Sequence, residues 1–530
     1  MAIFMLLAVF LVGVVRQVSE LNILYIKSCS YAVYNTKYWS RRGIDGPPSL
    51  PFFGHLFQLY DPLNPASFKL HEYSKVYGKV YGVQRGLRNA LVVSDAKLAH
   101  EIFNERFESF HQRDRPPIIR NIDTDPNIHL LTAAGKRWKR LRALSAPAFS
   151  TGNLRKVLPI MEDCAQQTIG WLEKAFKTNK EFDISRYFEE FSLDIIRRVA
   201  LGQVGSHQFT DNMAFDLKQT FADSQSWLML YSWVFPSLGP FIRKVTVQLL
   251  HLRSYLTNNG LIRVVNSCSK AINDRKQKQY SKEQSDFIDL FLSMEVEQLD
   301  QEETTVYEKS KASVVKRLTS LEVLMQCIFF LLAGFDTTAN SLTIVAYYLA
   351  KKPELQQKIV AEIEEVCCGE VGTLNLNMRS PTFEELAQLK YTEAFIRECL
   401  RFHPIAQPVV ARRCVAPCRL SNDLLVEKDV DILLDVLSLH VDKEVWGDQA
   451  DEFWPERFLE ERPPVMYSFG SGPRTCIGMR FSILEQKAII FHLLKKFKLV
   501  ATEAMGEKIC LTGNAVMTAE NAIIRLEKRH

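Results

Sequence analysis

The longest uninterrupted helical pattern in the sequence covers residues 319–352. It opens with Thr319 and Glu322, a capping-box pair in which each side chain bonds the backbone N–H of the other residue, and it stops at Pro353. About 33 residues at a rise of about 1.5 Å each predict a helix roughly 50 Å long, enough to cross a whole domain. The apolar run ends at Asp336 after about 13 residues, which is too short to span a membrane.

Shorter patterns predict many further helices and a little sheet. Residues 479–497 and 135–149 read as helices, and residues 154–294 as a series of amphipathic helices. Apolar residues on both sides of a turn predict a hairpin over 78–94, whereas residues 107–134, rich in Pro, Asp and Asn, predict a long irregular loop. The predicted fold class is therefore mainly α with a small β region (α+β), with one long central helix.

One apolar segment has two interpretations. Residues 227–235 contain two tryptophans, a tyrosine and a phenylalanine, and nine residues are too few to cross a bilayer. The segment is either a core helix or a membrane-dipping lip, because Trp and Tyr favour the membrane interface.

The first residues carry a membrane signal. Residues 1–15 are uninterrupted apolar, and basic residues follow from Arg16 onward. The length suits a secretory signal, but there is no basic stretch before the run and no small-residue cleavage site after it. We predict an uncleaved membrane anchor over residues 1–26, a basic and Pro-rich hinge over 27–60, and a cytosolic catalytic domain over 61–530.

Composition narrows the class of protein. The chain has 530 residues, 47% of them hydrophobic, and no composition shift divides it after the first segment. A net charge of +5 is too small for a nucleic-acid-binding protein, so no nucleic acid partner is expected. The 11 cysteines show no paired spacing, which argues against a disulfide framework and a zinc site.

The most informative motif is the loop over residues 469–478, FGSGPRTCIG. Its glycines and proline exclude a helix and hold Cys476 just ahead of a predicted helix N-terminus. The helix dipole and the neighbouring Arg474 are expected to lower the pKa of the thiol, and a thiolate is a soft metal ligand. The alternative for such a cysteine is a buried structural residue in a glycine-rich turn.

The middle of the long helix reads AGFDTT, over residues 333–338. Gly334 weakens a helix by about 1 kcal/mol, and a carboxyl at Asp336 in an apolar helix is unfavourable without a partner. Small residues let a flat ligand lie against the helix, and Asp336 with Thr337 makes a possible proton relay.

Two further groups of residues are candidates for site or structure. Trp138 and Arg142 lie one turn apart on a predicted helix and are able to clamp a carboxylate, while Arg137, Lys139 and Arg140 would form a basic surface patch. Glu398 and Arg401 are spaced for an ordinary ion pair on a second helix.

Together these motifs resemble the cytochrome P-450 superfamily, the haem-thiolate monooxygenases. The pattern F-G-x-G-x-R-x-C-x-G matches its haem-binding loop, A-G-x-D-T-T its long helix, and Glu398-x-x-Arg401 with Arg457 its structural triad. The resemblance implies a triangular helical core with the long helix over haem b. It also implies that Cys476 ligates the haem iron, that Asp336 and Thr337 are catalytic, and that further residues contact the haem, namely Trp138, Arg142, Arg474, Arg412, Gly334 and Phe469.

The resemblance also implies a function. An animal microsomal member inserts one oxygen atom from O₂ into a lipophilic small molecule, with electrons from NADPH through a flavoprotein reductase and cytochrome b5 as a further donor. It is anchored in the endoplasmic reticulum membrane with its catalytic domain on the cytosolic face. A haem-thiolate isomerase or dehydratase and a non-enzymatic haem protein are the alternatives.

Three local departures from the family pattern concern the region beneath the cysteine loop. The connection between Phe458 and Phe469 is about five residues shorter than is usual in membrane-bound members. Ser468 stands where a proline is usual, and the sequence His440-Val441-Asp442 replaces His-Arg-Asp.

Overall fold

The computed structural model describes residues 28–529, apart from 62, 115–116, 118–121, 123–124, 179, 224–226, 257–259, 278–286, 297–316, 369–378, 407–409, 462–463 and 514–515. The predicted membrane anchor therefore lies outside the described residues.

Most described residues are helical. In chain order the α-helices are α2 (Leu56–Leu59), α3 (Ala66–Tyr77), α4 (Ala96–His100), α5 (Phe107–Phe110), α6 (Gly135–Ser145), α7 (Thr151–Thr178), α8 (Ser185–Ala200), α9 (Met213–Asp223), α10 (Trp227–Val234), α11 (Gly239–Leu256), α12 (Gly260–Gln277), α13 (Phe287–Leu292), α14 (Ser320–Lys351), α15 (Pro353–Cys368), α16 (Phe383–Gln388), α17 (Lys390–Phe402), α18 (Val436–His440), α19 (Lys443–Trp446) and α20 (Met479–Lys496). Shorter turns are the 3₁₀ helices η1 (Ser40–Arg42), η3 (Ala146–Phe149), η4 (Pro236–Leu238), η6 (Pro455–Leu459), η7 (Gly472–Arg474) and η8 (Glu503–Met505), and the π-helix η2 (Glu101–Glu105).

The strands form small sheets. The largest has the order β1-β2-β10-β7-β3, with β10 parallel to β2 and the other pairs antiparallel. Its strands are β1 (Val80–Arg85), β2 (Arg88–Val93), β3 (Gln112–Arg113), β7 (Arg412–Arg413) and β10 (Asp431–Leu434). A second sheet joins β11 (Phe497–Ala501), β14 (Ile523–Lys528) and β4 (Phe182–Asp183). The two-stranded sheets pair β12 (Leu511–Thr512) with β13 (Thr518–Ala519), β5 (Glu295–Val296) with β6 (Leu318–Thr319), and β8 (Cys418–Arg419) with β9 (Leu425–Val426).

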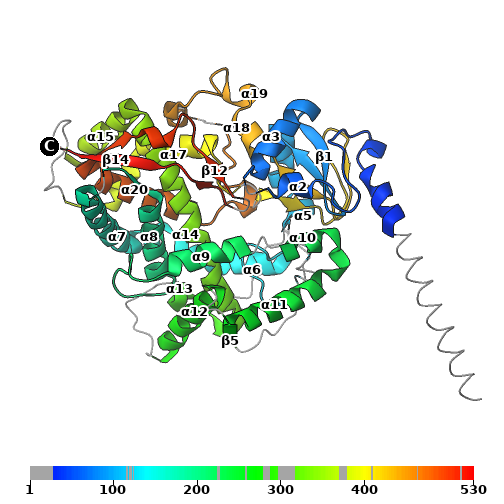
Figure 1. Ribbon diagram of the computed structural model, residues 1–530, viewed down its shortest axis with the longest axis horizontal. Helices are drawn as coiled ribbons and strands as arrows, with labels where there is room; N and C mark the ends of the chain where they lie inside the picture. Colours follow the sequence, from blue (N-terminus) through cyan, green and yellow to red (C-terminus); the bar gives the residue numbers. More distant parts are fainter. Residues whose placement is uncertain are drawn as a thin grey trace, which may run out of the picture.

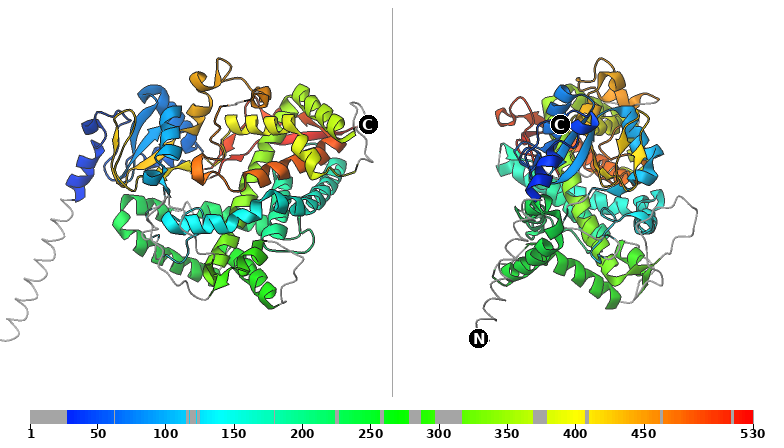
Figure 2. Two further views of the ribbon diagram at one scale, coloured as in Figure 1. Left: turned by 180° about the vertical axis from the view of Figure 1, so that it is seen from behind. Right: turned by 90° about the vertical axis from the view of Figure 1, so that its right-hand side faces the viewer.

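Figures 1 and 2 place the five-stranded sheet at one end of the molecule and the helices over the rest, so the predicted α+β class is confirmed. The hairpin is also confirmed, although its turn is only Gly86 and Leu87. The predicted irregular loop over 107–134 is wrong at its start, where α5 and β3 form. β3 forms because its partner β7 comes from a segment about three hundred residues later, which a local pattern does not reveal.

Helix α14 is the axis of the helical part, as predicted. Thr319 and Glu322 make the capping box, with the Glu322 N–H 3.2 Å from Thr319 Oγ1, and Pro353 opens the next helix. In Figure 1 this helix passes between α8 and α17. Among the described helices it is the one long and apolar enough to span a membrane, but most of its apolar window is buried inside the protein. It is therefore a core helix.

The expected basic patch on α6 is wrong. Arg137 and Arg140 are buried, and their guanidinium groups lie 3.1 and 2.7 Å from the Glu322 carboxylate. The pKa of Glu322 is lowered because hydrogen bonds and charge from Arg140 outweigh its burial. One carboxylate thus caps α14 and joins it to α6.

Helix α20 packs into the core on nearly all sides and carries a buried acid, Glu485. Its Oε1 has no hydrogen-bond partner among the described residues. Burial raises the pKa of Glu485 to about 8, and the Ser192 hydroxyl on α8 opposes this shift only in part. The folded protein therefore keeps this carboxyl protonated at neutral pH.

Replacing Glu485 by glutamine is expected to flatten the pH dependence of stability. Between about pH 4.5 and 8 the folded chain holds a proton that the unfolded chain releases, so the contribution of Glu485 is full below that window and is lost as the pH rises through it. Above pH 8 the variant should be more stable than the parent by roughly 5 kcal/mol. Urea denaturation of the holoprotein from pH 5 to 9 measures this, with the exposed Glu503→Gln as control. An unchanged pH profile would contradict the assignment.

Candidate active site

The cysteine loop is a tight turn between η7 and α20. Gly470 and Gly472 have φ angles of 73° and 70°, which favour glycine. A Cβ on Gly472 would lie 2.1 Å from the Phe103 carbonyl oxygen, so η2 packs directly against this turn. The Cys476 N–H donates to the Phe469 carbonyl at 2.8 Å, which closes the loop and fixes the direction of the thiol.

The Cys476 thiol has accessible surface although protein encloses it. Burial raises its pKa, and the N–H groups of Gly478 and Met479 and the charges of Arg113 and Arg142 oppose that shift. The expected lowering of its pKa is therefore wrong, because desolvation outweighs the helix N-terminus. Arg474 is not one of the opposing charges; its guanidinium turns away and donates to the carbonyl of Leu131 at 3.2 Å.

Four arginines gather beside the Cys476 thiol: Arg113 and Arg142 influence its pKa, and Arg113, Arg142 and Arg412 influence that of Arg474. Arg113 of β3 stands directly opposite Arg412 of β7, a strand pairing of like charges that is normally unfavourable. Burial, followed by the charges of neighbouring arginines, holds the pKa values of Arg412 and Arg474 well below their usual range. The sequence had given no sign of Arg113, because its strand partner is so distant in the chain.

These arginines fit a large anion. Arg412 Nε and Nη2 and Arg474 Nε are buried without a hydrogen-bond partner among the described residues. Buried donors are normally paired, and like charges gathered in one place need a counter-charge. A ligand with more than one carboxylate beside Cys476 would supply both.

Trp138 holds Arg474 in place. It is buried in α6, 5.5 Å from the Phe107 ring, and the Arg474 guanidinium lies 4.6 Å above its own ring. Arg142, one turn further along α6, is half-buried and close enough to Cys476 for the thiolate charge to oppose the lowering of its pKa. Both residues of the predicted clamp therefore lie beside the arginines that gather near Cys476.

The centre of α14 carries the predicted acid and alcohol. Asp336 is buried, its Oδ1 accepts from Asn340 Nδ2 at 3.0 Å, and burial raises its pKa to about 6. Thr337 is half-buried, and its hydroxyl donates to the Ala333 carbonyl at 2.7 Å.

Gly334 has a packing role in this helix. A Cβ there would lie 2.9 Å from Ile196 Cδ1, so the missing side chain lets α14 approach α8 closely. The contact of Gly334 with a cofactor stays a prediction.

Glu398, Arg401 and Arg457 are brought together beneath the cysteine loop. Arg401 makes two hydrogen bonds of 2.8 Å to the Glu398 carboxylate, and Arg457 Nε lies 3.3 Å from Glu398 Oε1. All three are buried, and the remaining guanidinium N–H groups donate to backbone carbonyls, among them Ala450 and Gln449. The group therefore fixes several segments that carry no regular structure.

Two residues from the segments that depart from the family pattern, Ser468 and the unchanged His440, tie this group to the cysteine loop. Ser468 Oγ donates to the Leu400 carbonyl at 2.6 Å. His440 lies between Arg401, whose carbonyl is 2.9 Å from Nδ1, and Tyr467, whose N–H donates to Nε2 at 2.8 Å. Burial lowers the pKa of His440 to about 3, so its ring is neutral and bridges as donor and acceptor. The serine in place of proline thus adds a bond between the loop and α17.

Replacing Arg401 by alanine is expected to prevent accumulation of folded, haem-loaded protein. Removing one member of a buried ion group typically costs about 3–5 kcal/mol, because its partner is left uncompensated. Arg397→Ala, one turn earlier on α17 with a half-exposed partner Glu393, is the control and should load normally. The yield of holoprotein per unit of expressed chain is the measurement. A stable Arg401→Ala holoprotein would remove the triad's structural role.

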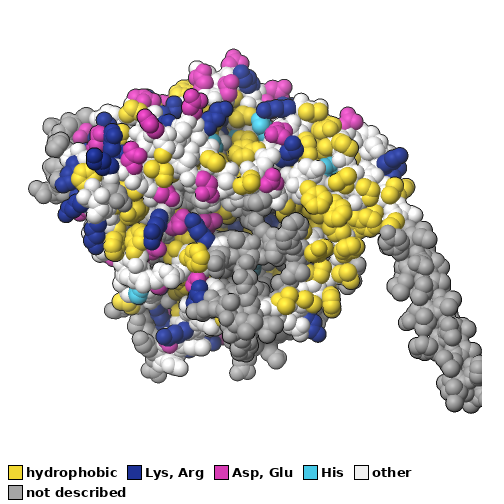
Figure 3. Space-filling view, in the orientation of Figure 1, with side chains coloured by type: hydrophobic (Ala, Val, Ile, Leu, Met, Phe, Trp, Pro, Cys, Tyr) yellow, Lys and Arg dark blue, Asp and Glu magenta, His cyan; other side chains and the backbone are white. Residues whose placement is uncertain are grey.

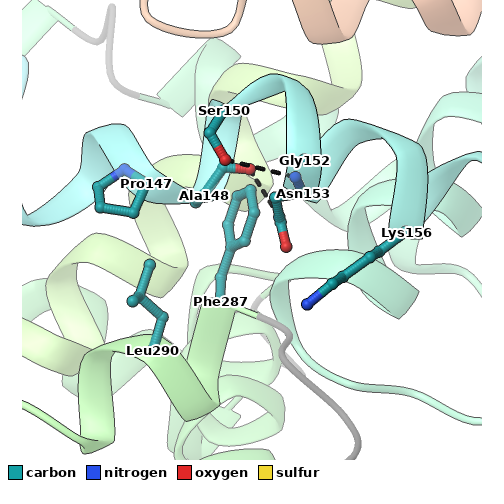
Figure 4. A pocket seen from close by; sticks show the side chains of 8 residues that line it. All are labelled: Pro147, Ala148, Ser150, Gly152, Asn153, Lys156, Phe287 and Leu290. Atoms are coloured by element: carbon teal, nitrogen blue, oxygen red, sulfur yellow. Dashed lines mark hydrogen bonds between the residues drawn. The ribbon is translucent and has the colours of Figure 1, made fainter.

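A separate surface groove of about 310 Å³ lies between the start of α7 and α13 (Figure 4). It is lined by Pro147, Ala148, Ser150, Gly152, Asn153, Lys156, Phe287 and Leu290. None of the predicted site residues is among them, and we assign it no function.

Comparison with known proteins agrees with this geometry. The family described as cytochrome P-450 matches residues 44–525. The chain is similar to three proteins of Caenorhabditis elegans named as cytochromes P-450. CYP13A2 is 36% identical over 512 residues, with 96% of this chain and 97% of that protein covered. CYP13A4 is 35% identical over 527 residues (96% and 98%), and cyp-13B1 is 35% identical over 523 residues (96% and 99%).

The fold and the site define an oxidoreductase of the haem-thiolate type. The chain belongs to the cytochrome P-450 family, and it is a monooxygenase that uses haem. The residues present fit that group: the Cys476 thiol keeps accessible surface, and the buried donors of Arg412 and Arg474, which lack partners among the described residues, suit its two propionates.

Proposed function

We propose that this chain is a membrane-anchored monooxygenase that inserts one oxygen atom from O₂ into a lipophilic small molecule. The observation that carries the proposal is Cys476 in its glycine-formed loop beside a cluster of arginines. When bound, haem b would supply the oxygen-activating iron, and Cys476 would ligate it. Arg412, Arg474 and Arg142 would hold its propionates, with Trp138 supporting Arg474.

The distal residues would supply protons. Asp336 has a pKa of about 6, so its carboxyl exchanges protons near neutral pH, and Thr337 lies beside it on α14. Phe469 and Gly334 complete the proposed contacts with the cofactor. The protein itself would ligate the haem iron, exclude water from the site and deliver protons.

Electrons would come singly from NADPH through a flavoprotein reductase, with cytochrome b5 as a further donor. The family generally uses redox partners, which supports this arrangement. The alternatives, an isomerase or dehydratase that needs no electrons and a non-enzymatic haem protein, are separated from it by the test below.

An aromatic surface supports contact with a bilayer. Phe53 and Phe57 of the hinge are exposed. Tyr231 of α10, Phe235 directly after it and Phe241 of α11 are exposed as well. The hinge and α10 lie side by side, because the ring centroids of Phe52 and Phe235 are 6.5 Å apart and Trp233 packs against Leu56. Figure 3 shows apolar side chains gathered at this end of the molecule. The two interpretations of residues 227–235 thus combine: Trp233 is core, while Tyr231 and Phe235 face outward.

We therefore expect residues 1–26 to anchor the chain in the endoplasmic reticulum membrane, residues 27–60 to serve as the hinge, and residues 61–530 to lie on the cytosolic face. Carbonate-washed microsomes should retain the full chain, and protease added outside should digest the catalytic domain. A glycosylated or N-terminally trimmed product would reverse this topology.

The activity is tested with the full chain in vesicles together with NADPH–cytochrome reductase. NADPH consumption that depends on both the reductase and a lipophilic compound, with an oxygenated product, is expected. Rearrangement of a peroxide without reductase would identify an isomerase. Haem binding with neither reaction would identify a non-enzymatic protein.

A further inference from the structure

Arg113 is the one arginine of the cluster beside Cys476 to which the proposed function gives no role. It is half-buried on β3, the strand at one end of the five-stranded sheet. The pairing of β3 with β7 sets it directly opposite Arg412. Like charges that face each other across two strands are destabilising. The sheet alone therefore does not account for an arginine at this position.

The side chain of Arg113 reaches the cysteine loop. Its Nη2 donates to the backbone carbonyl of Arg474, two residues before Cys476, at 3.0 Å. The loop is thus held at two points, because the Cys476 N–H donates to the Phe469 carbonyl. A hydrogen bond from a charged donor is stronger than one between neutral groups. Arg113 therefore fixes the chain that leads into the cysteine.

The charge of Arg113 also acts on the sulfur. Arg113 and Arg142 are the charges that oppose the rise of the pKa of the Cys476 thiol on burial. In return, burial lowers the pKa of Arg113 to about 10, and the thiolate charge of Cys476 opposes that shift. Arg113 thus stays charged at neutral pH, within electrostatic reach of the sulfur. Because both groups are enclosed by protein, their interaction is stronger than it would be in water.

We propose that Arg113 is a positioning residue that holds the cysteine loop through the Arg474 carbonyl and, by its positive charge, raises the reduction potential of the haem iron. The inference rests on the proposed function, because it takes Cys476 as the ligand of that iron. A positive charge nearby favours the reduced iron, which carries one positive charge less. The step concerned is the gain of one electron from the flavoprotein reductase, with no bond made or broken.

The test is the reduction potential of the purified, haem-loaded full chain, measured by titration with dithionite and redox mediators. Arg113→Gln removes the charge and keeps an N–H donor. Its potential should fall by about 30–90 mV, which is about a three- to thirtyfold change in the reduction equilibrium at about 59 mV per tenfold. Arg113→Lys keeps the charge and should stay within about 18 mV of the parent, a change of about twofold.

Arg480→Gln is the matched control. It removes an exposed arginine close to Cys476 in the sequence, whose charge water and salt screen. Its potential should also stay within about 18 mV of the parent.

The reduced carbon-monoxide spectrum of each protein is recorded beside the titration. Absence of a thiolate-type spectrum in the parent would refute the proposed function. A normal spectrum with an unchanged potential in Arg113→Gln would overturn only the role of Arg113, and so would an equal fall in Arg113→Lys or in Arg480→Gln. If Arg113→Gln loads no haem, Arg113→Lys decides: the potential of the parent supports the role of the charge, and a lowered potential overturns it.

Discussion

Replacing Cys476 by alanine is expected to abolish the thiolate-type absorption of the haem-loaded protein while leaving the fold intact. The loop is closed by the backbone bond from the Cys476 N–H to the Phe469 carbonyl, and its turns depend on glycines, so both features survive the loss of the sulfur, which removes only the acceptor for the N–H groups of Gly478 and Met479. Without the thiolate the haem iron would lack the proposed protein ligand, and the reduced carbon-monoxide spectrum should lose its characteristic band completely. Product formation should fall to background with it.

The control for this variant is Cys510→Ala. Cys510 is also an exposed free cysteine; it directly precedes β12, and its backbone bonds are to Asn521 and Glu520. It should keep the full spectrum and activity. A normal carbon-monoxide spectrum in Cys476→Ala would move the ligand elsewhere and remove the basis of the proposed function.

The sequence predicted those parts of the molecule that are determined locally. The bounds of α14 follow from the capping box at Thr319 and from Pro353, and those of α20 from the glycine-rich loop before it. Glu398 and Arg401 are one helical turn apart, so their ion pair could also be predicted from the sequence. Such features depend on neighbours within a few residues, which one sequence contains in full.

The missed parts depend on contacts between distant segments. Arg113 lies in the site because β3 pairs with β7. Arg140 is buried and forms an ion pair with Glu322, which is 182 residues away in the sequence. A helical pattern shows which residues share a face, but not what covers that face. The pKa of Cys476 was mispredicted for a related reason: the helix N-terminus is visible in the sequence, whereas the desolvation that outweighs it comes from the whole fold.

Proton supply separates a monooxygenase from a protein that merely binds haem, and Asp336 is where it can be tested. The carboxyl is buried on α14 with Asn340 as hydrogen-bond partner, and Lys218 and Glu189 are the charged groups that influence its pKa, in opposite directions. Asparagine has the same shape and retains a hydrogen-bonding oxygen, but it cannot give up or take up a proton in this pH range. The Asp336→Asn variant should therefore load haem normally.

Asp336→Asn is expected to lower turnover by about 10²–10⁴-fold, the usual contribution of a positioned acid–base group. Because the pKa of Asp336 is about 6, the fraction of parent protein in which Asp336 is protonated falls as the pH rises above 6. The turnover of the parent should decrease over the same pH range, and the turnover of the variant should not.

Thr337→Val should lower the amount of product and raise the hydrogen peroxide released per NADPH. Thr343→Val, which removes a similar hydroxyl bonded to the Ala339 carbonyl on the same helix, is the control. Unchanged turnover, pH profile and peroxide yield in both site variants would reduce Asp336 and Thr337 to helix packing, and the proton route would have to be sought on another element.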